Sequence, residues 1–200
     1  MFGVRGHGFE LDDPLSREEL ANLEAQLGVA LPADYRSFLL EVGAGGAGPS
    51  YGLYPVRRAG GGWCWVGDGA DLADLGLVGE PFPGPLDGAA LTALFADRPD
   101  EEEFEDVEQF FPVFEAWEER MLEIMWPPER TAGAICLCHH GCALRSWLIV
   151  SGPERGHIWF DGRADEDDMT PELIDGALVT FERWYADWLR ETEREASRAQ

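Results

Sequence analysis

The chain has 200 residues, of which 45% are hydrophobic and 12% aromatic, so it is long and apolar enough to fold around one core. Asp and Glu number 39 against 15 basic residues, which are all Arg, and the net charge is −24. A body this negative repels phosphate backbones and anionic membranes, so we expect neither nucleic acid nor a membrane as a partner. It attracts basic proteins, although the charge is also consistent with a role in solubility alone.

The first fifteen residues contain Asp12, Asp13 and three glycines where a signal peptide needs an apolar run. No apolar stretch is long enough to cross a bilayer. The cysteines are Cys64, Cys136, Cys138 and Cys142, and nothing in the sequence indicates export. We therefore expect reduced thiols and a cytoplasmic protein.

The N-terminal part predicts two helices. Ser16 and Glu19 form a capping box, in which the hydroxyl and the carboxylate satisfy free N–H groups at a helix start. The buried face of this helix is expected to carry Leu20, Leu23 and Leu27, and Gly28 is expected to end it. Pro32 can open the second helix, whose predicted buried stripe is Tyr35, Phe38, Leu39 and Val42.

A glycine-dense loop over 43–48 follows, and it lacks the Lys-Ser/Thr sequel of a phosphate-binding loop. We expect an irregular strand over 51–56 and a second one that places Trp63 and Trp65 on one face and Cys64 on the other. Residues 67–86 are rich in Gly, Pro and Asp and are typical of an irregular connection.

The middle of the chain is acidic and aromatic. Residues 100–106 are almost wholly acidic, and apolar residues follow at mixed spacing as far as Met125. We expect one or two amphipathic helices, interrupted by Pro112 and ending before Pro127.

The clearest strand pattern comes next, with strands expected over 134–138, 144–151 and 157–161. A turn around Gly141 and a turn over 152–156 are too short for parallel crossovers, so the three strands form an antiparallel meander. The last predicted helix has a stripe of mostly aromatic residues: Leu178, Phe181, Trp184, Tyr185, Trp188 and Leu189. Its polar tail over 191–200 is expected to fray. The element order predicts a single α+β domain over 1–200, an antiparallel β-sheet flanked by N-terminal helices, a helical insertion and a C-terminal helix.

Several spaced residues resemble the SUKH superfamily. The opening motif is represented by Leu20, Leu23, Glu24, Leu27-Gly28, Leu31-Pro32, Tyr35 and Phe38-Leu39. The second half is similar through Gly141-Cys142, Trp147 to Val150, Gly152, Gly156, Ile158-Trp159, Asp161 and Pro171, and then through Phe181, Trp184 and Trp188-Leu189. The segment 91–126 departs from the family pattern and is interpreted as an acidic, aromatic, helical insertion.

The resemblance implies an antiparallel sheet backed by helices and a role in binding other proteins. Bacterial members look like immunity proteins that neutralise polymorphic toxins, often nucleases, and fungal relatives act in cell-wall synthesis and stress signalling. The matched residues are core formers and turn glycines, so they transfer no catalytic residue. We therefore predict a protein that is not an enzyme, needs no cofactor and neutralises a basic toxin by occlusion. The alternative is a regulatory adaptor of the same fold with an endogenous partner. The oligomeric state stays open.

We select partner-binding candidates for charge or for aromatic contact area: Glu101, Glu102, Glu103, Asp165, Glu166, Asp167, Asp168, Trp63 and Trp65. The acidic runs are equally consistent with solvated loops, and the two tryptophans with core residues.

The cluster Cys136, Cys138, His139, His140 and Cys142 offers two further alternatives. Cys136, Cys138, His139 and Cys142 could bind zinc, although the spacing differs from that of standard structural zinc sites. Cys142 could be a nucleophile with His139 or His140 as its base. We prefer a hairpin with buried thiols and exposed histidines, and so predict neither a metal nor a catalytic residue.

Overall fold

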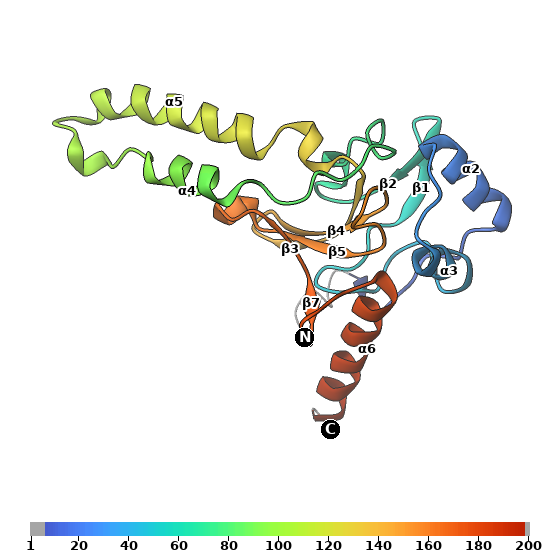
Figure 1. Cartoon of the computed structure of the whole chain (residues 1–200). Helices are drawn as coiled ribbons and strands as arrows, with labels where there is room; N and C mark the ends of the chain where they lie inside the picture. The colour runs from blue at the N-terminus through green and yellow to red at the C-terminus, as the bar shows by residue number, and fades with distance from the viewer. Residues whose placement is uncertain (1–6, 199–200) are drawn as a thin grey trace.

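The computed structural model describes residues 7–198 and confirms the α+β class (Figure 1). Within these residues five α-helices accompany antiparallel sheets, and the last helix ends the described chain. Parts of two expectations, the start of the chain at 1–6 and the end of the polar tail at 199–200, lie outside the described residues. Within residues 7–198, no helix has the length and apolar character needed to span a membrane.

The two N-terminal helices are α2 (Arg17–Leu27) and α3 (Ala33–Glu41). The predicted capping box is confirmed: Ser16 Oγ accepts from Glu19 N at 3.2 Å, and Ser16 N donates to Glu19 Oε2 at 2.8 Å. Gly28 ends α2 with φ 69°, a left-handed conformation that a residue without Cβ adopts at little cost. Val42 was wrongly placed in the buried stripe, because α3 ends before it and its side chain is 44% exposed.

A small hairpin of β1 (Val56–Ala59) and β2 (Gly62–Trp65) follows the glycine loop. Regular strand begins only at Val56, because 51–55 is irregular apart from a single bridge between Leu53 and Gly46. Tyr54 N donates to Leu137 O, which joins this segment to the central sheet. The irregular connection contains a 3-10 turn, η1 (Ala70–Leu72).

The central sheet has four antiparallel strands in sequential order: β3 (Ala134–Gly141), β4 (Leu144–Ile149), β5 (Ile158–Asp161) and β6 (Met169–Pro171). A second hairpin, β7 (Leu173–Ile174) and β8 (Ala177–Leu178), leads to the last helix. The predicted meander is present, but its first turn was misplaced. Cys142 and Ala143 form the two-residue turn, with φ 49° and 62°, and both histidines belong to β3. Paired positive φ values suit a hairpin because they match the strand twist.

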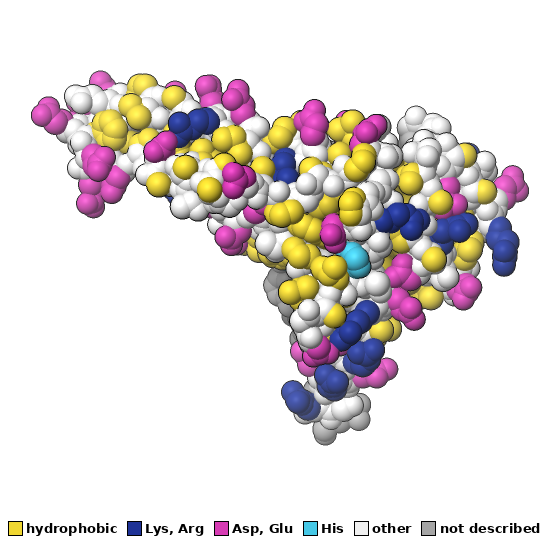
Figure 2. Space-filling model, viewed as in Figure 1, with side chains coloured by type: hydrophobic (Ala, Val, Ile, Leu, Met, Phe, Trp, Pro, Cys, Tyr) yellow, Lys and Arg dark blue, Asp and Glu magenta, His cyan; other side chains and the backbone are white. Residues whose placement is uncertain are grey.

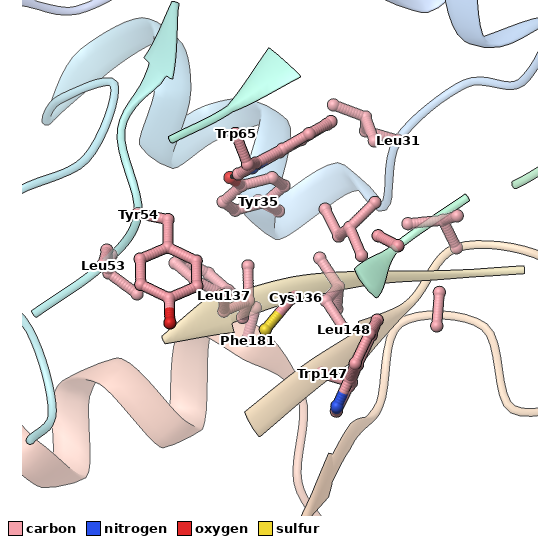
Figure 3. Close-up of a cluster of buried hydrophobic side chains, with 14 of the residues drawn as sticks. Leu31, Tyr35, Leu53, Tyr54, Trp65, Cys136, Leu137, Trp147, Leu148 and Phe181 are labelled. Atoms are coloured by element: carbon pink, nitrogen blue, oxygen red, sulfur yellow. Dashed lines mark hydrogen bonds between the residues drawn. The ribbon is translucent and has the colours of Figure 1, made fainter. Parts of the chain in front are cut away.

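The core packs around β3 and β4, whose residues are buried almost without alternation, as expected of strands covered on both faces. Figure 3 shows Leu137, Trp147 and Leu148 of the sheet together with Tyr35, Trp65 and Phe181 in one cluster of buried side chains. Tyr35, Phe38 and Phe181 meet at ring distances between 4.8 and 6.4 Å, which joins α3 to the C-terminal helix.

The C-terminal helix α6 (Phe181–Arg198) keeps Phe181, Trp184 and Tyr185 buried, as its stripe predicted. Two residues were wrongly assigned to that stripe. Leu178 belongs to β8 and is 41% exposed, and Leu189 is 42% exposed. The tail does not fray within the described residues, because α6 remains helical through Arg198.

A two-helix arm, here defined as residues 86–126, projects from the body (Figure 1). It consists of α4 (Gly88–Ala96), the 3-10 turn η2 (Glu101–Glu103) and α5 (Val107–Met125). Helix α5 continues through Pro112, where we expected an interruption, because the proline lies near its start and removes only one interior hydrogen bond. A further turn, η3 (Pro128–Thr131), returns the chain to the sheet.

The arm has a small core of its own. Its buried residues are Leu94, Trp117 and Met125, and the Trp117 indole donates to Leu94 O at 2.9 Å. Partly buried apolar side chains surround them: Leu86, Leu91, Phe95, Phe114, Met121, Ile124 and Trp126. The two helices are thus held to each other without help from the main core.

A buried ion pair anchors α5 to the sheet. Arg163, at the start of η4 (Arg163–Asp165), binds both carboxylate oxygens of Asp161 at 2.8 and 2.7 Å, and the two side chains are 2% and 1% exposed. Its remaining terminal nitrogen donates to Met125 O at 2.8 Å, and the guanidinium lies 4.2 Å from the ring centre of Trp126. The Trp147 indole also donates to Asp161, at 3.0 Å. These bonds join β4, β5 and the end of α5.

We expect Asp161→Asn to lower the free energy of unfolding by about 3–5 kcal/mol, because it leaves the Arg163 guanidinium buried without its carboxylate. Urea titration followed by circular dichroism would measure the change. The matched control is Asp175→Asn, which breaks the exposed Arg183–Asp175 pair at 2.7 Å and should cost less than about 1 kcal/mol. Equal losses in the two variants would contradict an anchoring role for the buried pair.

Candidate functional site

The structure places the two predicted acidic clusters at the two ends of the arm. Glu101, Glu102 and Glu103 form η2, the exposed turn between α4 and α5 at the far end of the arm (Figures 1 and 2). The loop that carries Asp165 to Asp168 lies at the root of the arm, because Asp168 accepts from the backbone of Leu86, the first residue of the arm. In the same loop, Glu166 binds Arg98 at 2.6 and 2.8 Å. Asp165 and Asp167 are exposed beside it.

Asp168 differs from its neighbours because intramolecular bonds occupy its carboxylate. One oxygen accepts from Arg130 at 2.6 Å and from the backbone of Met169 at 2.7 Å. The other accepts from the Leu86 backbone at 2.5 Å, and Arg130 also donates to Gly84 O at 2.7 Å. Asp168 and Arg130 therefore join the two ends of the arm to the sheet, a role that leaves the carboxylate little capacity to bind a partner.

Trp63 and Trp65 do not join this surface. Each is only 6% exposed, because the alternation of β2 turns both rings into the main core. The Trp65 indole donates to Tyr35 Oη at 2.8 Å, and the backbone of Trp63 is bonded to the Gln26 amide. The core interpretation of these tryptophans, and not the interface interpretation, agrees with their burial.

Acidic residues far outnumber basic residues in the arm. Residues 86–126 contain 13 acidic and 2 basic residues, a net charge of −11 out of −24 for the chain. Both arginines have partners: Arg98 binds Glu166, and Arg120 pairs with Asp97 at 3.3 Å. Figure 2 shows acidic side chains along the arm and at its far end, with apolar side chains between them.

The apolar part of this surface was missed by sequence reasoning. Val107, Phe111 and Leu122 lie on one flank of α5 and are 43%, 53% and 47% exposed. Helical spacing from residue 107 places them beside the face that packs on α4, so α5 is apolar over a wider arc than α4 covers. A helical-wheel comparison of α5 with the shorter α4 would have indicated this excess. The arm therefore offers apolar contact area between carboxylates.

The cysteine–histidine hairpin has a different geometry from the one that a zinc site requires. A register shift at 137 sets Cys136 opposite Trp147 and Cys138 opposite Ser146, so the two thiols point to opposite faces of the sheet. Cys142 lies exposed in the turn. Among residues 7–198, no three His, Cys, Asp or Glu side chains are grouped so that they could hold a metal ion.

The hairpin is also a poor source of a nucleophile. Burial raises the pKa of the Cys138 thiol to about 12 and raises the pKa of Cys136 well above its ordinary value, so both stay protonated near neutral pH. His139 is 3.0 Å from the Asp68 carboxylate, and both ring nitrogens of His140 face serines. Cys142 therefore lacks the oriented base that the nucleophile alternative requires.

His140 instead belongs to a buried polar network. Its Nδ1 is 2.5 Å from Ser50 Oγ and its Nε2 is 2.8 Å from Ser146 Oγ. Ser146 donates to Glu172 at 2.8 Å, so the hydroxyl accepts from His140 Nε2–H, and Nδ1 accepts from Ser50. Glu172 is also bonded to the Trp184 side chain. The network thus connects the segment just after the glycine-dense loop, the sheet and α6.

Burial lowers the pKa of His140 to about 4, with a smaller contribution from the neighbouring His139, and burial raises the pKa of Glu172. In the unfolded chain His140 takes up a proton below about 6.5, whereas in the folded chain it stays neutral down to about 4. The His140 contribution to stability is therefore complete above pH 6.5 and is lost as the pH falls toward 4.

We expect this loss to disappear in His140→Gln, which keeps one donor and one acceptor but does not titrate. Relative to the variant, the wild type should lose on the order of 2 kcal/mol of unfolding free energy between pH 6.5 and 4. Urea titrations at several pH values would measure the difference, with His157→Gln as a control outside the network. A difference that does not vary with pH would contradict a neutral, buried His140.

The comparisons with known proteins agree with this geometry. The family model for the SMI1 / KNR4 family (SUKH-1) matches residues 14–173, which include α2, α3, the central sheet and the arm. No curated protein and no solved structure matches the chain. Because the match spans well over half of the 200 residues, the chain belongs to the SMI1 / KNR4 family (SUKH-1).

Proposed function

We propose that this protein is an immunity protein that neutralises a polymorphic toxin of the nuclease type by occlusion, and that the acidic arm enters the basic substrate groove of the toxin. Family membership fits an immunity or regulatory module that works through contacts with other proteins. The observation that carries the proposal is the arm itself, which projects from the body with a net charge of −11.

The physical reason is charge complementarity. A nuclease binds its substrate through Lys and Arg aimed at phosphates, and a surface with regularly placed carboxylates competes for the same cations. Long-range attraction raises the association rate, while exposed apolar side chains such as Phe111 and Leu122 supply contacts that slow dissociation. The arm is supported by buried pairs at its root, so it presents these groups without an ordering cost at the moment of binding.

Three further parts of the proposal rest on the same reasoning. The protein acts without catalysis, because its buried thiols are protonated and His140 is bonded within the network. It works in a reducing compartment, the cytoplasm, which keeps its four cysteines as free thiols. Residues 91–126 are an insertion into the family pattern, and this insertion supplies the partner specificity.

The partner would be identified by affinity capture from native lysate at low and high salt. The proposal expects a basic polypeptide that cleaves nucleic acid when alone, loses that activity with an equimolar amount of this chain and is retained less at high salt. Capture of signalling or cell-envelope proteins with no nuclease activity would replace the proposal by the regulatory adaptor.

For the captured partner, we expect the triple variant Glu101→Gln, Glu102→Gln and Glu103→Gln to lower the association rate constant by about tenfold at low salt. The dissociation rate constant should change little, because charge at the rim of an interface mainly steers the encounter. Surface plasmon resonance would separate the two rate constants.

The matched control removes three exposed carboxylates elsewhere, with Glu18→Gln, Glu191→Gln and Glu193→Gln. It makes the same change in net charge but should leave the association rate within about twofold of the wild type. Equal effects of the two triple variants would show that total charge, and not the arm, steers the partner.

A further inference from the structure

A second surface lies on the body of the molecule, between α3 and α6. The two helices form an open groove of about 380 Å³. Its floor consists of the rings of Phe38, Phe181 and Tyr185, which pack against one another at 4.9 to 6.0 Å. The groove is therefore apolar and has a rigid base of three mutually packed rings.

Two side chains on the walls of the groove are exposed where their helices predict burial. Val42 follows the end of α3 and is 44% exposed, and Leu189 on α6 is 42% exposed. Both belonged to apolar stripes that the sequence assigned to the core. Helical spacing continues the stripe of α6 through Leu189, but the helix extends past the body, so the described residues leave this side chain exposed (Figure 1).

The charged groups that line the groove are all acidic: Asp34, Glu41 and Glu182. Asp34 is partly engaged, because one of its oxygens accepts from the backbone of Glu182 at 3.1 Å. Glu41 and Glu182 are exposed at the rim. The arginines of α6 do not line this groove: Arg183 and Arg190 border an adjoining depression that shares Glu182 and Ala186 with it.

An apolar floor with a rim of carboxylates selects an occupant with apolar anchors and flanking cations. We propose that the α3–α6 groove binds an amphipathic helix of a partner protein, whose apolar residues at i, i+3 and i+4 enter the groove and whose Lys or Arg side chains face Glu41 and Glu182. A helix fits because α3 and α6 already form the two walls of the groove. A third helix can lay its apolar face between two such walls, as in other helix-in-groove complexes. Acidic and phosphate-bearing ligands are repelled by the same rim.

This inference does not rest on the proposed function, because the groove and the arm share no residue and lie on different parts of the molecule (Figure 1). The partner of the groove is either the same protein that binds the arm or a different one. Failure of toxin capture would leave the groove inference intact, and failure of the experiment below would leave the arm proposal intact.

The test uses the full chain and a fluorescein-labelled helical peptide made of two LKKLLKL heptads. We expect fluorescence anisotropy to give a Kd of about 10 μM, weakening as salt is added. Leu189→Arg and Val42→Arg fill the groove and repel the peptide lysines, so each should raise the Kd at least about tenfold. Both side chains are exposed in the native state, so both variants should fold, which circular dichroism would verify.

Leu72→Arg in η1 is the matched control, since Leu72 is 41% exposed, belongs to neither proposed surface and gives the same change in net charge. It should change the Kd by less than about twofold. A peptide of two LEELLEL heptads should bind at least about tenfold more weakly than the lysine peptide. In ¹H–¹⁵N spectra, the lysine peptide should shift the amide signals of Ser37, Val42, Ala186 and Leu189.

Three results would overturn the inference. If Leu72→Arg weakens binding as much as Leu189→Arg does, the peptide responds to the overall negative charge. If the glutamate peptide binds equally well, the acidic rim has no role in selecting the occupant. If the wild-type chain does not bind the lysine peptide, or if the shifted amides lie outside α3 and α6, the groove is not a docking surface for this chemistry.

Discussion

The direction in which the arm leaves the body depends on the buried Asp161–Arg163 pair. Transferring two charges into a dry interior costs several kcal/mol for each ion, so the pair is not an efficient way to add stability. The pair instead fixes the orientation of the elements that it joins. The Arg163 guanidinium donates hydrogen bonds to Asp161 of β5 and to the last carbonyl of α5. The Trp147 indole of β4 donates a further hydrogen bond to the Asp161 carboxylate. Apolar side chains of similar volume would fill the space without fixing these directions, so we interpret the pair as a device for orientation.

The distribution of charge explains why a chain of net charge −24 tolerates an acidic arm. Helix α5 has 19 residues and is therefore about 28 Å long. At physiological ionic strength exposed charges are screened over about 8 Å, so the acidic turn at the far end interacts weakly with the acidic body. Repulsion among the carboxylates of the arm itself remains, and its two arginines are already engaged. A basic partner would relieve this repulsion, which connects the shape of the arm to the chemistry of the partner that we propose.

Local signals predicted much of the fold. The capping box at Ser16, the leucine stripe of α2 and the antiparallel meander all depend on residues close together in the sequence, and each was found in the structure. Errors arose where tertiary pairing overrides local preference. The register shift at 137 turns Cys138 away from Cys136, and the turn at Cys142 and Ala143 uses positive φ values that residues other than glycine seldom adopt. Neither feature has a signature in the spacing of the residues.

The candidate surfaces were harder to predict for the same reason. The acidic runs were visible in the sequence, but only the fold shows that Asp168 is occupied by Arg130 and the Leu86 backbone, whereas Glu101, Glu102 and Glu103 are exposed on the arm. For the exposed apolar residues, the sequence pattern indicates burial that the fold does not provide. Phe111, Val42 and Leu189 follow helical spacing and resemble core residues, yet their partner helices are too short or end too early to cover them. An amphipathic pattern states which face of a helix is apolar, but not whether the same chain covers it.

The arm and the α3–α6 groove combine the same two components in different proportions. On the arm, carboxylates dominate and the apolar flank is narrow, which favours fast, salt-sensitive association. In the groove, three packed rings form the floor and only a few carboxylates border it, which favours contacts that persist after docking. A partner that engages both surfaces would be attracted by the first and retained by the second. Under the two proposals, charge in this protein selects the class of partner, whereas the apolar side chains that its own helices leave uncovered determine how long that partner stays.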